Sequence, residues 1–446
     1  MGTFPVDPEL GKDTMLLFSY FYPLEVSNFK VTSPTSHSVY TLDHARSSSD
    51  GMRRHIIYNL SNETGVWKYE IWLKNMEPTP NATLTVTSLP HNREVKPVQV
   101  SVHLFVDETP TGHLGRKLST RVIVVADVRQ GVSPISGACV MAEISRPDGA
   151  TVYKNLPDNG LGDPDFWSSD GLYSNYFTEF SGGGRYSVKV QVTSVLGRTQ
   201  VETVFQHGIA RKMEGHFQRV VSVGTFINAI DFNSTEEDRI PPSEIHRLEN
   251  VSPPFNDGVI TIRLVAPGDD YNVGIAANYE IKYLKTDFPD EVIEEFENIK
   301  HNVISVNDII RGSLEPQPAG TVQYISFYLP EGNYYVAIRA IDKSGNKGGV
   351  KEAVNVQSVL HCPKDEALFP HPSECSKYLI CSISLLKPQL MACPHELHFN
   401  PQKKYCDWPE IADCKTYEIP KMNNIKSKSN GIGCSIHAPQ RIINRP

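Results

Sequence analysis

Six of the eight cysteines lie close together near the C-terminus, and thiols at such density either bind a metal or form disulfides. They are Cys362, Cys375, Cys381, Cys393, Cys406 and Cys414, separated by 12, 5, 11, 12 and 7 residues. Zinc is the main alternative, but the segment lacks the paired C-x2-C knuckles of common zinc sites. A segment this short cannot fold on apolar burial alone, so the crowding favours disulfides. Spacing alone does not choose among the many pairings of six cysteines.

Two segments imitate known metal sites without completing them. His395 and His398 flank Glu396 in a pattern one residue shorter than the H-E-x-x-H zinc site, and no helix is expected there. The segment from Asp342 to Asn346 follows an apolar strand, like the metal-binding loop of von Willebrand A domains, but Asn346 replaces the final serine. A hairpin turn explains its Asp, Gly and Asn residues. We expect neither segment to bind a metal.

An acid-rich stretch at residues 158–171 is a third candidate for a metal site. Calcium takes about six to eight oxygen ligands, and Asp158, Asp163, Asp165 and Asp170 could supply some of them. Their spacing is not that of an EF-hand, and Asp and Gly also form turns without any metal. We therefore favour turns, keep calcium as the alternative, and expect no other metal or cofactor.

The residues between the six cysteines resemble the type 2 chitin-binding, or peritrophin-A, family. The matching segments are residues 374–381, 393–394, 397–401 and 405–409. The resemblance implies chitin, or another glycan that contains N-acetylglucosamine, as the ligand. It also implies three disulfides: Cys362 with Cys381, Cys375 with Cys414, and Cys393 with Cys406.

Chitin is uncharged, so a protein must recognise it through aromatic rings that stack on the sugar and through hydrogen bonds to the acetamide groups. The candidate contacts are Tyr378, Phe399, Asn400, Tyr405 and Trp408. Tyr378 and Phe399 could instead form the core, because a domain this small must bury its rings. Tyr405 and Trp408, beside a cysteine on a short predicted hairpin, are expected to be exposed.

Upstream of these cysteines, apolar residues alternate with polar ones. The run 66–73 has the period of two that is typical of half-buried strands, and further predicted strands lie at 121–126, 186–192 and 334–341. The sequence therefore predicts a mostly β protein with tandem antiparallel β-sandwiches, a small disulfide-rich β-hairpin module and a disordered tail. The expected parts are a β-sandwich region at 1–115, a second β-sandwich at 116–230, a linker at 231–256, a fibronectin type III-like domain at 257–358, the cysteine module at 360–415 and a basic tail at 416–446.

Two cysteines stand outside the set of six and have no evident partner. Cys139 lies in a predicted strand and Cys434 lies in the basic tail. A buried cysteine commonly behaves as a small apolar side chain, so we expect Cys139 to be a free thiol.

Composition and short motifs indicate the compartment. The 43 Lys and Arg residues against 51 Asp and Glu residues give a net charge of -8, which argues against nucleic acid as a partner. We expect no transmembrane segment, because no apolar run approaches about 20 residues. The start lacks a signal peptide, yet the cysteines favour a secreted or cell-surface protein, so we expect an incomplete N-terminus. Glycosylation sequons agree with this and occur at Asn59, Asn62, Asn81, Asn233 and Asn250.

Most of residues 1–360 resembles the C-terminal half of the calcium-activated chloride channel regulator family. The segments that carry the resemblance are 4–7, 158–173, 184–190 and 266–271. It implies a β-sandwich region followed by a fibronectin type III domain, and association with an ion channel. The family's zinc metalloprotease and von Willebrand A domains have no counterpart in this sequence, so no catalytic residue is carried over.

Two hypotheses follow from these patterns. The first is an extracellular, non-catalytic protein that binds chitin through its six-cysteine module. The alternative is the C-terminal part of a self-cleaving metalloprotease of the regulator type. A chitinase is disfavoured, because the sequence lacks both paired carboxylates on a barrel strand and the alternation of a (β/α)8 barrel.

Overall fold

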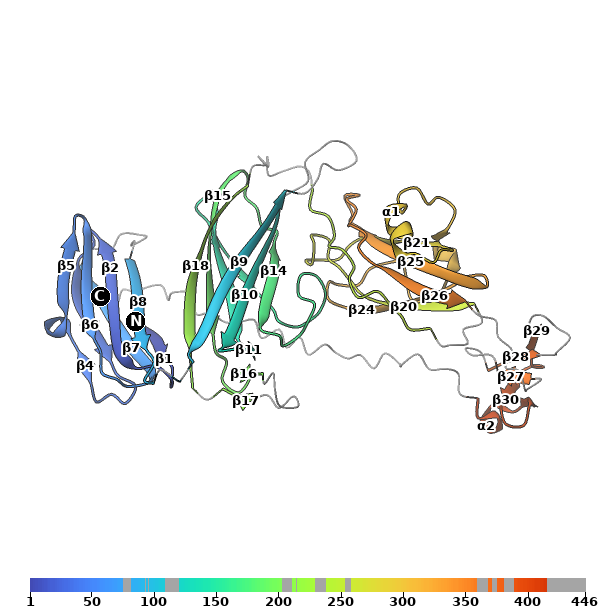
Figure 1. Cartoon of the computed structure of the whole chain (residues 1–446), viewed down its shortest axis with the longest axis horizontal. Coiled ribbons are helices and arrows are strands. Elements are labelled where there is room, and N and C mark those ends of the chain that lie inside the picture. The colour runs from blue at the N-terminus through green and yellow to red at the C-terminus, as the bar shows by residue number, and fades with distance from the viewer. Residues whose placement is uncertain are drawn as a thin grey trace. The chain divides into compact units, whose positions relative to one another are not determined.

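The computed structural model describes residues 1–74, 82–92, 94, 96–108, 120–202, 211–213, 215–228, 238–252, 258–358, 368–370, 375–380 and 389–414. Strands dominate these residues, and the α-helices among them are short (Figure 1). The described residues fall into two compact units. The first contains those of Met1–Gly160 and Trp167–Ser234, and the second contains Leu161–Phe166 and those of Thr235–Gly431.

The first unit begins with a sandwich of two four-stranded antiparallel sheets. One has the order β1-β7-β3-β4 and the other β5-β6-β2-β8. The strands are β1 Gly2–Val6, β2 Lys12–Phe21, β3 Val26–Thr32, β4 Val39–Tyr40, β5 Arg46–Asp50, β6 Arg53–Asn59, β7 Gly65–Leu73 and β8 Ala82–Leu89, and the 3-10 turn η1 Leu42–His44 follows β4. Alternate side chains of these strands, among them Phe18, Phe29 and Trp67, are buried between the sheets. The alternate residues of the predicted period of two are therefore the residues that form the core.

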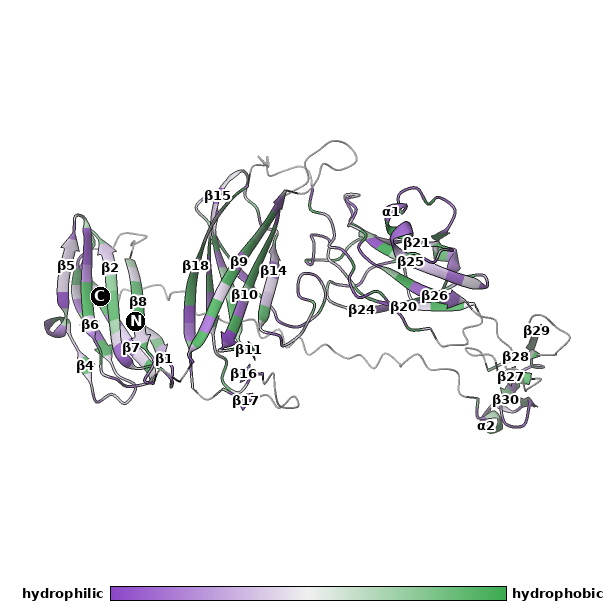
Figure 2. Cartoon of the chain, in the orientation of Figure 1, coloured by the Kyte–Doolittle hydropathy of each residue, from purple (hydrophilic) through white to green (hydrophobic). Residues whose placement is uncertain are grey.

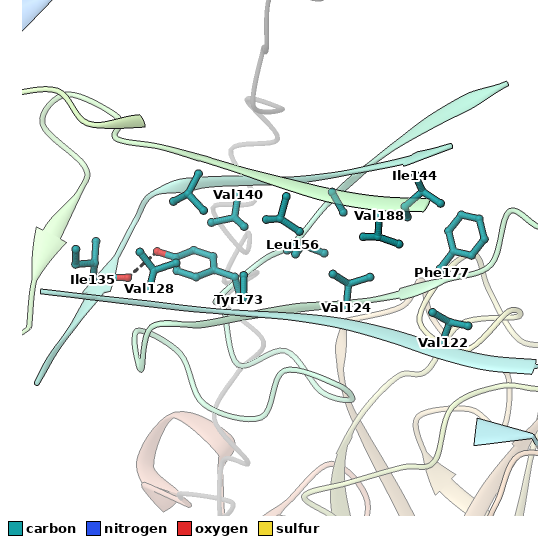
Figure 3. Close-up of a cluster of buried hydrophobic side chains, with 14 of the residues drawn as sticks. Val122, Val124, Val128, Ile135, Val140, Ile144, Leu156, Tyr173, Phe177 and Val188 are labelled. Atoms are coloured by element: carbon teal, nitrogen blue, oxygen red, sulfur yellow. Dashed lines mark hydrogen bonds between the residues drawn. The ribbon is translucent and has the colours of Figure 1, made fainter. Parts of the chain in front are cut away.

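A second sandwich in the same unit pairs the sheet β14-β10-β11-β16-β17, to which β9 is added along β10, with the sheet β13-β12-β15-β18. Its strands are β9 Val98–Glu108, β10 Thr120–Gln130, β11 Ser133–Ser136, β12 Cys139–Ser145, β13 Thr151–Asn155, β14 Leu172–Phe177, β15 Gly184–Thr193, β16 Gln200–Val201, β17 Arg211–Lys212 and β18 Gln218–Asn228. Apolar and polar residues alternate along most of β9 (Figure 2). Every second residue of β10 from Val122 to Val128 is buried. Valines and isoleucines of facing strands fill the core, and the Tyr173 hydroxyl donates to the Ile135 carbonyl over 2.9 Å (Figure 3).

Two expectations about the second sandwich need correction. β9 pairs with β10 from Val98 onward, so the sandwich begins earlier than residue 116, the expected boundary. Cys139 is disulfide-bonded, so the prediction of a free thiol is wrong. Its partner lies outside the described residues, and a cysteine's surroundings in one strand do not reveal a partner elsewhere in the chain.

The second unit contains a third sandwich, whose sheets have the orders β19-β20-β24-β23 and β22-β21-β25-β26. The elements are β19 Glu249–Asn250, β20 Val259–Val265, β21 Asn278–Leu284, α1 Pro289–Glu294, β22 Val303–Ile304, η2 Val306–Asp308, β23 Ile309–Arg311, β24 Val322–Tyr328, β25 Gly332–Ile341 and β26 Ala353–Ser358. Part of the expected linker 231–256 belongs to this sandwich, because β19 pairs with β20, and Ile245 and Leu248 lie in its core.

The segment after β25 is a turn, as its sequence predicts. Ile341 and Lys347 form an antiparallel bridge, and the backbone N–H of Asn346 donates to the Asp342 carboxylate over 2.7 Å. Burial raises the pKa of the Asp342 carboxyl.

His246 of the second unit lies between two carboxylates and beside an aromatic ring. Its Nε2 is 3.6 Å from Glu244 and its Nδ1 is 3.4 Å from Glu352, and its ring centroid is 4.6 Å from that of Phe166. The hydrogen bond to Glu244 raises the pKa of His246, as do the charges of Asp163 and Glu352, and together they outweigh the opposite effect of burial. The folded state therefore favours the imidazolium ion.

This raised pKa predicts a pH dependence of stability. The contribution of His246 is fully present below its unfolded-state pKa of about 6.5 and is lost as the pH rises through the higher folded-state pKa. We expect the urea midpoint of the second unit to decrease as the pH rises above about 6.5, and His246→Gln to flatten this part of the profile. If the urea midpoint of the variant changes with pH as that of the parent does, groups other than His246 cause the pH dependence.

Candidate functional site

Two small sheets and one helical turn form the described part of the cysteine module. β27 Leu368–Pro370, β28 Lys377–Ile380 and β29 Gln389–Ala392 make an antiparallel sheet, and β30 His398–Asn400 forms a hairpin with β31 Tyr405–Asp407. The helical turn α2 Pro409–Ala412 follows. Proline is favoured at the first position of a helix, because it donates no backbone hydrogen bond and its φ is already helical.

Two disulfides hold these elements together. Cys375 bonds to Cys414 with a Cα–Cα distance of 5.8 Å, and Cys393 bonds to Cys406 with a Cα–Cα distance of 5.7 Å. Both are pairings that the peritrophin-A resemblance implies. The third implied pair, Cys362 with Cys381, lies outside the described residues. The bond of Cys375 joins the start of β28 to the residues after α2, so it closes the module.

Phe399 is the buried ring of the module. It is 1% exposed and stacks on Tyr378, with ring centroids 4.9 Å apart and an interplanar angle of 13°. Its backbone N–H donates to the Cys375 carbonyl over 2.8 Å. Phe399 therefore has the core role that the sequence offered as its alternative and is not a sugar contact, because a ring without an accessible face cannot stack on a ligand. Tyr378 is only partly exposed and covers one face of Phe399.

Asn400 also serves the fold rather than a ligand. It is 4% exposed, and its side-chain oxygen accepts from the backbone N–H groups of Gln402 and Lys403 at 3.0 and 2.9 Å. Its amide nitrogen donates to the Ile411 carbonyl over 3.1 Å. Asn400 thus shapes the hairpin turn and ties it to α2. Its predicted bond to an acetamide group does not fit, because its oxygen already accepts two hydrogen bonds and its side chain is buried.

Among the described residues of the module, the large exposed apolar side chains lie on β31 and around α2. Tyr405 is 51% exposed, Trp408 57% and Ile411 52%. The carbonyl of Trp408 accepts from the N–H groups of Ile411 and Ala412, which fixes the main chain beneath the indole. The sequence predicted the exposure of the two aromatic residues. The sequence analysis did not predict the exposure of Ile411, although Pro409 is a signal for the short helix on which Ile411 lies.

One ion pair lies beside these side chains. Lys403 lies 3.1 Å from Asp407, and its ammonium is 5.6 Å from the ring centroid of Tyr405. The hydrogen bond from Lys403 lowers the pKa of Asp407, and the same bond raises the pKa of Lys403. An exposed pair of this kind adds little to stability.

The segments considered as metal sites in the sequence have other structures among the described residues. His398 lies on strand β30, whereas the H-E-x-x-H site requires a helix. The Asp158 carboxylate accepts from the backbone N–H groups of Ser169, Asp170 and Gly171, which supports the turn interpretation of that stretch. Asp163 and Asp165 are buried. In the part of the chain that the structure describes, no group of three His, Cys, Asp or Glu side chains could hold a metal ion.

The glycosylation sequons have different surroundings. Asn59, Asn62 and Asn250 are exposed, and the Asn250 amide also donates to the Asn355 carbonyl over 3.2 Å. Asn81 and Asn233 lie outside the described residues, as do Cys434 and the expected disordered tail. No helix within the described ranges is both long and apolar enough to span a membrane.

The comparisons with known proteins agree with this architecture. Residues 362–414 match the model of the chitin binding Peritrophin-A domain. The chain is also homologous to calcium-activated chloride channel regulators. It is 27% identical to human calcium-activated chloride channel regulator 1 over 417 residues, which are 84% of this chain and 41% of that protein.

Other comparisons extend this result. Human calcium-activated chloride channel regulator 2 is 28% identical over 425 residues, which cover 83% of this chain and 41% of the relative. The chain thus spans about 41% of the length of these regulators. Among solved structures, the match to a DUF4785 family protein from Legionella pneumophila covers 80% of this chain and 84% of that protein. The TM-score is 0.30 and the sequence identity is 10%. A score this low carries no argument about the fold.

Proposed function

We propose that this chain is an extracellular, non-catalytic protein that binds chitin through residues 362–414, with its sandwiches acting as spacers. The observation that carries the proposal is the match of these residues to the chitin binding Peritrophin-A domain, together with the exposure of Tyr405 and Trp408 on the module. Disulfides, exposed sequons and the homology to regulators support an extracellular location.

The exposed surface suits a neutral polysaccharide. A pyranose ring presents C–H groups on its face, and an aromatic ring packs against that face while it removes apolar area from water. Tyr405 and Trp408 offer such faces, and Ile411 adds apolar area. Because chitin is uncharged, the binding free energy should depend little on ionic strength.

Chitin beads test the proposal directly. We expect the full chain to be retained in both low and high salt and to be released by soluble N-acetylglucosamine oligomers. A chain that ends at Ser358 keeps all three sandwiches and should pass through the column. Cellulose beads, which lack the acetamide group, are the matched control for the ligand. Equal retention of the truncated chain would assign binding to the sandwiches, and no retention of the full chain would contradict the function.

A second candidate follows from the share of the regulators that this chain covers. Because the chain spans about 41% of their length, it could be the C-terminal part of a longer, self-cleaving metalloprotease that also associates with a chloride channel. In that protein the chitin module would anchor an enzyme. Transcripts that encode an H-E-x-x-H segment upstream of Met1 would favour this candidate, and an in-frame stop codon upstream of Met1 would favour the first.

A further inference from the structure

Cys139 carries a covalent link whose other end the sequence did not reveal. It is the first residue of β12, lies opposite Thr193 of β15, and is 8% exposed. It is disulfide-bonded, and no cysteine in the described part of the chain is free. The second sandwich is therefore cross-linked to another part of the chain.

The count of cysteines limits the partner to three residues. The chain has eight cysteines, and the two disulfides of the module use four of them. Cys139 accounts for a fifth. The partner must therefore be Cys362, Cys381 or Cys434.

Two of these three belong to the module and are better paired with each other. Cys362 and Cys381 lie within the segment that matches the Peritrophin-A domain. The antiparallel pairing of Leu368 with Ile380 brings the chain before β27 and the chain after β28 to the same end of one sheet. Closing a short loop costs less chain entropy than closing one of more than 200 residues, so the local bond is favoured.

We propose that Cys139 and Cys434 form a disulfide that fastens the C-terminal segment to the second sandwich. The two thiols lose two protons and two electrons as the S–S bond forms. The electrons pass to the disulfide of a thiol–disulfide exchange partner, such as oxidised glutathione, which is reduced to two thiols. This pairing uses every cysteine of the chain. It is independent of the proposed chitin-binding function.

The bond changes how the module is attached. Without it, the module is joined to the sandwiches only through the chain that follows β26. With it, the chain between Cys139 and Cys434 becomes a closed loop that contains the third sandwich and the module. A single cut on either side of the module then leaves it covalently attached. A protein bound to a solid polymer through the module would therefore remain bound after a single proteolytic cut on one side of the module.

Peptide mapping under non-reducing conditions tests the pairing. After alkylation of free thiols, trypsin should release the peptide 130–154, which contains Cys139, linked to the peptide 429–441, which contains Cys434. Reduction should separate the two peptides. A link from 130–154 to the Cys362 peptide, 352–364, or to the Cys381 peptide, 378–403, would overturn the proposal.

A cleavable form of the full chain tests the consequence. We would insert the recognition sequence of a site-specific protease directly after Ser358. Cleavage should leave one covalent species on a non-reducing gel, and a reductant should split it into two fragments. The Cys139→Ser/Cys434→Ser double variant should split without any reductant while it still binds chitin beads. Release of the fragment from the cleaved parent without a reductant would contradict the link, whether or not the module binds chitin.

Discussion

Replacing Trp408 with alanine is expected to weaken binding to chitin by about 30-fold, which corresponds to about 2 kcal/mol, the scale of a central aromatic contact. The indole is 57% exposed and packs little of its surface against the module, so its removal should leave the fold intact. Affinity measured on chitin beads gives the effect on binding. A disulfide map and an amide spectrum that match those of the parent would show that the fold is retained.

Trp167→Ala is the matched control for this change. Trp167 is 68% exposed and lies on a loop of the first unit, outside the module. Its replacement removes an equally large exposed ring and should leave chitin retention unchanged. If Trp408→Ala binds chitin as the parent does, the assignment of the binding surface is wrong. If both variants lose retention equally, the effect is non-specific adsorption of exposed rings to the beads.

Replacing Phe399 with alanine is expected to unfold the module, at a cost of about 3 to 5 kcal/mol for the loss of a large buried ring. Phe399 is 1% exposed and is the stacking partner of Tyr378. A core in a domain this small supplies little more net stability than the substitution removes, so the module should lose both its fold and its binding. The sandwiches should remain folded, because each has a hydrophobic core of its own.

Limited proteolysis and amide spectra of the full chain would measure this change. Digestion of Phe399→Ala should remove signals of the module while the sandwich signals persist. Phe399→Leu, which keeps most of the apolar volume, should restore part of the protection. Persistence of a dispersed module spectrum in Phe399→Ala would show that the disulfides alone maintain the fold. The contrast with Trp408→Ala separates a ring that supports the module from a ring that faces the ligand.

The β class and the core faces could be predicted from the sequence because strand periodicity is local. In β15, Tyr186, Val188, Val190 and Val192 are all buried, every second residue, as the pattern indicated. Strand partners are not local. β9 was expected to lie in the first sandwich, but its backbone pairs with β10 over eleven positions. Alternation marks a strand without naming its neighbour, so a domain boundary drawn from it can be wrong.

The expected linker shows the same limit in another way. Its prolines and acidic residues indicate an irregular segment, and the backbone of its described residues, 238–252, is mostly irregular. Yet Ile240, Ile245 and Leu248 are buried, and β19 adds to the sheet beside β20. Isolated apolar residues carry no periodic signal. Their burial depends on the surface that the rest of the sandwich provides.

For the module, the cysteines and their flanking residues indicated the Peritrophin-A match and, through that resemblance, the two disulfides that the structure describes, because a scaffold without a large core depends on its cross-links. The sequence also predicted the exposure of Tyr405 and Trp408, whereas only the tertiary structure decided that Phe399 is a core residue and that Asn400 is buried. It alone showed that Cys139 is bonded. Residue type limits what a side chain can do, whereas its exposure and partners depend on chain segments that meet only after folding.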